Sequence, residues 1–264
     1  HIAQGIVLRS YDDAEYLVLA TRKGLVKKTA LSSYDSPRQA GLIAVNFRDA
    51  EDELIGAELV NADDDVLLVS RKGQGVRFPV DDEQVRPMGR TTSGVTGMRF
   101  RGDDELLSMA VIPAEADEDS RFLFSVTDEG YAKRTPVSEF RRQNRGGLGV
   151  RAMRLSDERG GLVAALVVSE EDEVISFKAS GQVIRSAVAD VSPTGRDTMG
   201  VKFVGIKGDD QVVAVTVNPE PEEDENAEEA GTESIAAAES EVASDDDGAT
   251  VGQDVSAERE ATDE

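Results

Sequence analysis

Basic side chains recur at a fixed distance from glycines along the chain. These regularly spaced basic residues are the candidates for the chemistry of the protein. A glycine recurs at intervals of 49, 57 and 51 residues, and the fourth residue after it is always lysine or arginine. The pairs are Gly24 and Lys28, Gly73 and Arg77, Gly130 and Arg134, and Gly181 and Arg185, with Lys27 and Lys133 directly before two of the basic residues. Such side chains donate charge-assisted hydrogen bonds to phosphate oxygens. The row therefore predicts a site for a polyanion.

A second basic row precedes a second glycine in every repeat. Its members are Arg38 before Gly41, Arg90 before Gly94, Arg145 before Gly149, and Arg196 before Gly200. Further basic candidates lie on either side of these glycines: Arg99, Arg142, Arg151, Arg154 and Lys202. One position per repeat becomes a row in space when repeats stack or close into a ring. We therefore predict a basic stripe along one edge, although single charges of this kind also protect exposed edge strands from aggregation.

The elements that must position these residues are short antiparallel strands. First strands are expected at 16–21, 66–70, 122–127 and 174–178, each followed by the first glycine, which suits a tight hairpin turn. A second strand follows that glycine. Third strands begin at the second glycine, where apolar residues alternate with others, as expected for a half-buried strand. Fourth strands are expected at 54–60, 106–112, 162–168 and 212–217. Four antiparallel strands per repeat predict an all-β, propeller-like fold of four-stranded blades.

The repeat boundaries predict four complete blades at about 11–61, 62–113, 114–169 and 170–217. Residues 1–10 contain an extra strand, 2–8, which resembles a fourth strand. We expect it to be the last strand of a truncated blade or, alternatively, a strand that closes a four-bladed ring.

The segment 218–264 differs from the repeats in charge. It holds 18 acidic residues and one basic residue. Because it is too polar to bury a core, we expect a disordered acidic tail. Such a tail either improves solubility or competes with an anionic ligand for the basic edge.

Composition removes several classes of function. The chain has no cysteine, and its single histidine is His1. We therefore expect no disulfide framework, no metal site, and no catalytic residue or cofactor within these residues. No apolar run approaches the roughly 18 residues of a membrane-spanning helix. We expect a cytoplasmic protein without a membrane partner.

The kind of nucleic acid follows from what the basic rows lack. No aromatic residue is placed with them to stack successive bases, which argues against single-strand binding. No recognition helix is available for the major groove. A basic edge without base-reading side chains predicts double-stranded DNA that is held by its phosphates and bent. The net charge of −24 does not exclude this ligand, because a polyanion responds to the local potential.

The repeats contain the segments Gly24-Leu-Val-Lys-Lys28, Gly73-Gln-Gly-Val-Arg-Phe78, Arg86-Pro-Met-Gly89 with Thr92-Ser-Gly-Val95, and Gly130-Tyr-Ala-Lys-Arg134. On these segments, residues 1–217 resemble the C-terminal domains of the DNA gyrase A subunit, a family of DNA-wrapping β-pinwheels. The family carries a box, Gln-Arg-Arg-Gly-Gly-Lys-Gly, in its first blade. Here the third repeat keeps Gln143, Arg145, Gly146, Gly147 and Gly149 of that box. It has Asn144 and Leu148 where the box is basic, so it looks like a degenerate internal copy.

The resemblance implies that the domain wraps duplex DNA in support of ATP-dependent negative supercoiling by a type IIA topoisomerase. It implies the gyrase B subunit and the N-terminal part of gyrase A as partners in an A2B2 complex. Magnesium and ATP would serve the whole enzyme, not this fragment. The incomplete box keeps the corresponding domain of topoisomerase IV, which selects decatenation substrates, as an alternative. A protein-interaction propeller is a further alternative, although the chain has no tryptophan to anchor such an interface.

Overall fold

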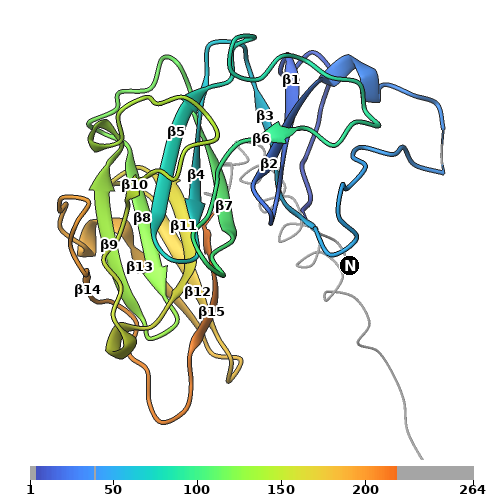
Figure 1. The fold of residues 1–264 in the computed structure, drawn as a ribbon. Coiled ribbons are helices and arrows are strands. Elements are labelled where there is room, and N and C mark those ends of the chain that lie inside the picture. The colour runs from blue at the N-terminus through green and yellow to red at the C-terminus, as the bar shows by residue number, and fades with distance from the viewer. Residues whose placement is uncertain (1–3, 39, 219–264) are drawn as a thin grey trace, which may run out of the picture. The chain divides into compact units, whose positions relative to one another are not determined.

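The computed structural model describes residues 4–38 and 40–218, and nearly all of the predicted acidic tail lies outside them. The described residues form four small antiparallel sheets and contain no α-helix (Figure 1). Four short 3-10 helices connect strands: η1 (Leu31–Tyr34), η2 (Val137–Glu139), η3 (Asp157–Arg159) and η4 (Val188–Asp190). The predicted all-β, propeller-like fold is confirmed.

Three sheets have four strands and the last sheet has three. In the order in which the strands pair, the first sheet is β3 (Leu54–Val60), β1 (Tyr16–Thr21), β2 (Leu25–Ala30) and β6 (Val95–Thr96). The second sheet is β10 (Val150–Arg151), β5 (Gln74–Pro79), β4 (Asp65–Ser70) and β7 (Leu106–Ile112). The third sheet is β11 (Leu162–Val168), β8 (Phe122–Thr127), β9 (Tyr131–Pro136) and β14 (Val201–Lys202). The fourth sheet is β13 (Val183–Ala187), β12 (Glu173–Lys178) and β15 (Val212–Val217).

The third strands of the second, third and fourth repeats lie in the sheet of the preceding repeat, which the repeat pattern alone does not predict. The third strand expected from Gly41 in the first repeat is not formed, since residues 41–47 have no strand pairing. β6, β10 and β14 pair with β2, β5 and β9, respectively (Figure 1). The carbonyl of the turn glycine fixes this exchange: Gly73 O accepts hydrogen bonds from the backbone N–H groups of Ala152, at 2.8 Å, and Met153. Gly24 O and Gly130 O accept the equivalent pairs of bonds. Each of the first three blades therefore contains strands of two repeats, whereas the strands of the last sheet all come from the fourth repeat.

Both rows of glycines are needed for this exchange. Gly73 has a φ of +76°, and a Cβ atom there would lie 2.6 Å from Met153 O. At Gly149, with a φ of +75°, a Cβ atom would lie 2.4 Å from Gly75 O. No other residue permits both this backbone conformation and this approach. Gly41 and Gly181, at the two ends of the repeat series, also have positive φ but no described atom within 4 Å of a Cβ position.

The core lies between consecutive blades, because the central strands are buried on both faces. Along β4, Val66 and Leu68 pack in the cluster shared with the first blade, whereas Leu67 and Val69 pack in the cluster shared with the third. A strand buried on both sides is apolar at successive positions instead of alternating. The fourth strands contact each other in order, β3 against β7, β7 against β11 and β11 against β15. The strands received from the next repeat thus lie at the opposite end of each of the first three sheets.

The extra N-terminal strand expected at 2–8 is not formed in its described part. Residues 4–8 have no strand pairing. Gln4 instead makes side-chain bonds to β3: its Oε1 accepts from the N–H of Ala57 at 2.7 Å, and its Nε2 donates to Glu58 Oε1 at 3.3 Å. The segment lies beside the fourth strand of the first blade without extending the sheet.

Candidate nucleic-acid interface

The first basic row is buried, so the prediction that it lies on the surface is wrong for five of its six members. Exposure is 3% or less for Lys27, Lys28, Arg77, Lys133 and Arg134. Only Arg185, in the last blade, is exposed. The five buried side chains cannot contact the phosphates of a bound duplex.

Four members of this row, those that lie four residues after the glycine, have a partner twelve positions earlier, at the start of the first strand. Arg77 donates from Nε to Asp65 Oδ2 at 2.6 Å, and Arg185 pairs with Glu173. Lys28 Nζ lies 4.5 Å from the centre of the Tyr16 ring. The guanidinium carbon of Arg134 lies 4.6 Å from the centre of the Phe122 ring. Carboxylates and aromatic faces both stabilise a buried cation, so this recurrence is the sequence signal that could have revealed the burial.

Acidic side chains from the following repeat complete these sites. Lys28 Nζ donates to Asp82 Oδ1 at 2.8 Å, Arg77 pairs with Glu118, and Arg134 pairs with Glu170 at 3.3 Å. Arg134 Nε and Nη1 have no acceptor among the described residues. The row therefore joins neighbouring repeats inside the protein.

Two buried lysines hold the backbone of the turns that carry the second basic row. Lys133 Nζ donates to the carbonyls of Ala152, at 2.6 Å, Gly195, at 2.9 Å, and Arg196. Lys27 Nζ donates in the same way to the carbonyls of Ala44 and Arg90. Burial lowers the pKa of both ammonium groups to about 8. They remain mostly protonated at neutral pH, and the three N–H donors of the Lys133 ammonium group match its three carbonyl acceptors.

The arginines of the second row reach back to the preceding repeat. Arg90 Nη1 donates to Ile43 O at 3.4 Å, Arg145 Nη1 to Thr96 O at 3.0 Å, and Arg196 Nη1 to Arg151 O at 3.4 Å. Each acceptor is the second residue after the preceding repeat's second glycine. These three arginines are half-buried, whereas Arg38 in the first repeat is exposed. Some of the hydrogen-bond donors of these three arginines are therefore used to join successive repeats.

The third segments of successive repeats are joined into what we call the outer belt, residues 41–47, 89–99, 142–154 and 195–202. Their backbones bond in one recurring pattern: Asn46 N donates to Thr92 O at 3.3 Å, Arg99 N to Gly147 O at 2.9 Å, and Arg154 N to Thr198 O at 2.9 Å. The belt includes β6, β10 and β14, at the sheet ends away from the packed fourth strands. Its exposed basic residues from the predicted set are Arg99, Arg142, Arg151, Arg154 and Lys202.

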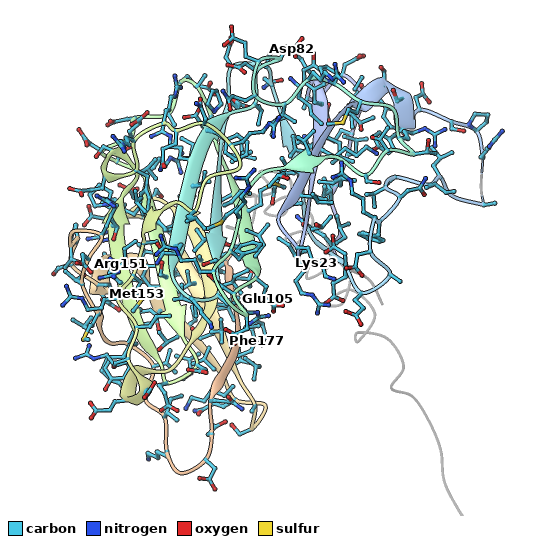
Figure 2. All side chains as sticks on the ribbon, viewed as in Figure 1. Lys23, Asp82, Glu105, Arg151, Met153 and Phe177 are labelled. Carbon is cyan, nitrogen blue, oxygen red and sulfur yellow. The ribbon has the colours of Figure 1, made fainter. Side chains whose placement is uncertain are left out.

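The exposed basic residues of the belt differ in their contacts. Arg142 pairs with buried Asp65 at 2.8 Å, and Lys202 Nζ donates to Glu129 O at 2.7 Å. Arg151, labelled in Figure 2 beside Met153, points its guanidinium to Asp197, as does Arg154. Arg99 lines a pocket of about 400 Å³ together with Lys72, Arg101 and Arg151. Sequence reasoning did not single out Lys72, Arg101 or Asp197.

The degenerate box has a structural role in this belt. Gln143 N donates to Arg77 O at 2.8 Å, and Gly146 N donates to Gly97 O at 2.6 Å. Arg145 also bonds to the backbone of Gln84. Leu148, where the family box has lysine, is exposed and lines the pocket beside Arg99. The box backbone therefore holds the second and third repeats together.

Two further features of the described residues bear on other kinds of function. No group of three or more His, Cys, Asp or Glu side chains in this part of the chain could hold a metal ion. No helix of residues 4–38 and 40–218 is long and apolar enough to cross a membrane.

Comparison with known proteins identifies the family. The family described as DNA gyrase C-terminal domain, beta-propeller, matches residues 15–61, 64–113, 121–169 and 170–219. The DNA gyrase A subunit of Nocardioides sp. is 52% identical over 256 residues, covering 87% of this chain and 28% of that protein. The DNA gyrase A subunit of Streptomyces coelicolor is 54% identical over 223 residues, covering 83% of this chain and 25% of that protein. The chain thus spans about a quarter of the length of these relatives.

Solved structures agree with the sequence comparison. A DNA gyrase A C-terminal domain aligns with a TM-score of 0.69 at 27% identity, over 80% of this chain and 68% of that one. The C-terminal domain of a DNA topoisomerase IV aligns with a TM-score of 0.72 over 81% of this chain and 65% of that one. Its 23% identity shows a shared fold alone. The predicted resemblance to gyrase A is confirmed, and the chain belongs to the DNA gyrase C-terminal domain family.

Proposed function

We propose that this domain binds duplex DNA along the outer belt and bends it, as the DNA-wrapping part of a gyrase A protein. The observation that carries the proposal is the belt itself. Backbone hydrogen bonds join the third segments of successive repeats, and exposed basic side chains recur along them. Repeated phosphate contacts along one path can offset the energy of bending a stiff duplex.

The contact set differs from the one expected from sequence. Arg99, Arg142, Arg151, Arg154 and Lys202 are exposed on the belt and remain proposed phosphate contacts, as do exposed Arg38 and Arg185. The half-buried Arg90, Arg145 and Arg196, which each donate from Nη1 to the preceding repeat, are proposed for the same task. Among the buried members of the first row, Lys27 and Lys133 instead support the belt from within, by binding its backbone carbonyls. Affinity would come from charge, with little dependence on sequence.

The role of the whole enzyme is part of this proposal. A domain that wraps DNA would present a segment of it to the strand-passing part of gyrase A. The gyrase B protein would supply ATP hydrolysis, and both would act with Mg²⁺ in an A2B2 complex in the cytoplasm. The support for this assignment is the identity of about half of the aligned residues with those of two gyrase A proteins.

A charge-matched substitution experiment tests the DNA-binding surface. One variant replaces Arg99, Arg151, Arg154 and Lys202 with alanine. The control replaces Arg22, Arg71, Arg121 and Lys207, which lie outside the belt, with alanine. Because both variants lose four basic side chains, they have the same net charge. In a titration of fluorescent duplex DNA against salt, the belt variant should bind more weakly, and its log–log salt slope should fall by about 0.9 for each lost phosphate contact. Equal affinities and slopes for both variants would contradict the proposed surface.

A further inference from the structure

One acidic side chain of the belt faces two of its exposed arginines. Asp197 lies three residues before Gly200, in the turn that also carries Arg196. The equivalent position is Thr91 in the second repeat and Gly146 in the third. The fourth repeat therefore places a negative charge where the second and third repeats have an uncharged residue.

The carboxylate of Asp197 is held in a forked arrangement. Its Oδ1 accepts from Arg151 Nη1 at 2.8 Å and from Arg154 Nε at 3.1 Å, and its Oδ2 accepts from Arg154 Nη2 at 2.9 Å. Two oxygens that receive parallel N–H donors from one guanidinium form the geometry by which arginine also binds a phosphate. The bonds from Arg154 and then from Arg151 hold the pKa of Asp197 well below its usual range. The carboxylate is therefore charged at neutral pH.

The backbone on both sides of Asp197 is fixed. Lys133 Nζ binds the carbonyls of Gly195 and Arg196, and Thr198 O accepts from the backbone N–H of Arg154 at 2.9 Å. The carboxylate is thereby kept beside the two arginines. All three side chains are about half exposed, and an ion pair in such a position is weak enough for another anion to displace.

We propose that Asp197 occupies, in the free protein, a phosphate site formed by Arg151 and Arg154, so that a DNA phosphate binds there only by displacing it. The inference rests on the proposed function of the belt. The inference predicts a difference between two equivalent contacts of the belt, the one between the second and third repeats and the one between the third and fourth. Arg99, in the second repeat, faces the turn of the third repeat, where Gly146 has no side chain to compete. Arg154 occupies the position equivalent to Arg99 and is masked. DNA would therefore bind more weakly at the contact between the third and fourth repeats than at the contact between the second and third.

The test is Asp197→Asn, which keeps the shape of the side chain and removes its charge. Its control is Asp209→Asn, an exposed aspartate outside the belt with the same change in net charge. We expect Asp197→Asn to bind duplex DNA about two- to fivefold more tightly at low salt, since an exposed ion pair no longer has to be broken. Its salt slope should also steepen. The gain should vanish when Arg151 and Arg154 are both alanine.

The outcomes separate this inference from the proposed function. Unchanged affinity in Asp197→Asn, with the belt arginines still required for binding, would overturn the masking role alone. An equal gain in Asp209→Asn would show an effect of net charge and would also overturn it. If the variant that lacks Arg99, Arg151, Arg154 and Lys202 binds like its control, the belt itself is wrong. Asp197→Ser gives the same readout should the asparagine variant lose its structure, which circular dichroism would show.

Discussion

Arg77 Nε donates to Asp65 Oδ2 at 2.6 Å inside the second blade, and both side chains are almost completely buried. Glu118 and the carbonyl of Phe140 bind the remaining donors of the guanidinium. A surface arginine of the same row, Arg185, pairs with half-buried Glu173 in the last blade. The same sequence position thus gives an internal ion pair in one repeat and a solvated one in another.

Removing Arg77 should destabilise the fold and not merely weaken DNA binding. Arg77→Ala leaves the buried carboxylate of Asp65 with Arg142 as its remaining cationic partner. The loss of one partner from a buried pair costs about 3–5 kcal/mol. Urea unfolding followed by circular dichroism measures the change. Arg185→Ala is the matched control, with an expected loss below about 1 kcal/mol, and similar losses in the two variants would contradict the structural role of Arg77.

The turn glycines should differ in their tolerance of alanine according to what packs over them. Gly73→Ala places a Cβ atom 2.6 Å from Met153 O, whereas Gly181→Ala meets no described atom within 4 Å. Both positions have positive φ, so both variants bear the strain of about 1–2 kcal/mol. Gly73→Ala should lose more stability than Gly181→Ala, because strands β5 and β10 have to move apart to make room for the Cβ atom. Thermal unfolding compares the two variants, and equal melting temperatures would count against strand exchange as the reason for this glycine.

The buried lysines predict a pH dependence of stability with a definite sign. Burial lowers the pKa of Lys133 from 10.5 to about 8 in the folded protein. Between these values the unfolded chain binds more protons, so the free energy of unfolding contributed by this group rises with pH across that window. Below pH 8 the full cost of burying the charge is present. Urea unfolding of the wild type and of Lys133→Met at pH 8, 9 and 10 should show a steeper rise for the wild type, and parallel curves would refute the shifted pKa.

The repeat and the hairpin turns could be predicted because they depend on residues that are close together in the sequence. The spacing from Gly24 to Lys28 recurs in every repeat, and the first and fourth strands were expected almost where they form. The exchange of β6, β10 and β14 could not be predicted in this way. It depends on pairing between residues of two repeats, such as Val26 with Val95, which no local periodicity encodes.

The burial of the first basic row could not be predicted from the sequence for a related reason. Charge alone favours a surface position, and the direction of a side chain depends on which face of the sheet a neighbouring repeat covers. Arg134 is buried because the start of the next repeat supplies Glu170 and its own blade supplies Phe122. Arg185, with the same spacing from its glycine, lies in a three-stranded sheet without an exchanged outer strand and stays exposed.

The degenerate box offers a gain-of-binding test of the outer belt. Leu148 is 38% exposed and lines the same pocket as Arg99 and Arg151, so Leu148→Lys adds a cation beside two proposed phosphate contacts without filling a core. The added contact should tighten duplex binding and steepen the log–log salt slope by about 0.9. Leu148→Gln is the control for loss of the apolar side chain, and it should leave the slope unchanged. A lysine variant that matches the glutamine variant in salt titrations would mean that the DNA does not pass over this part of the belt.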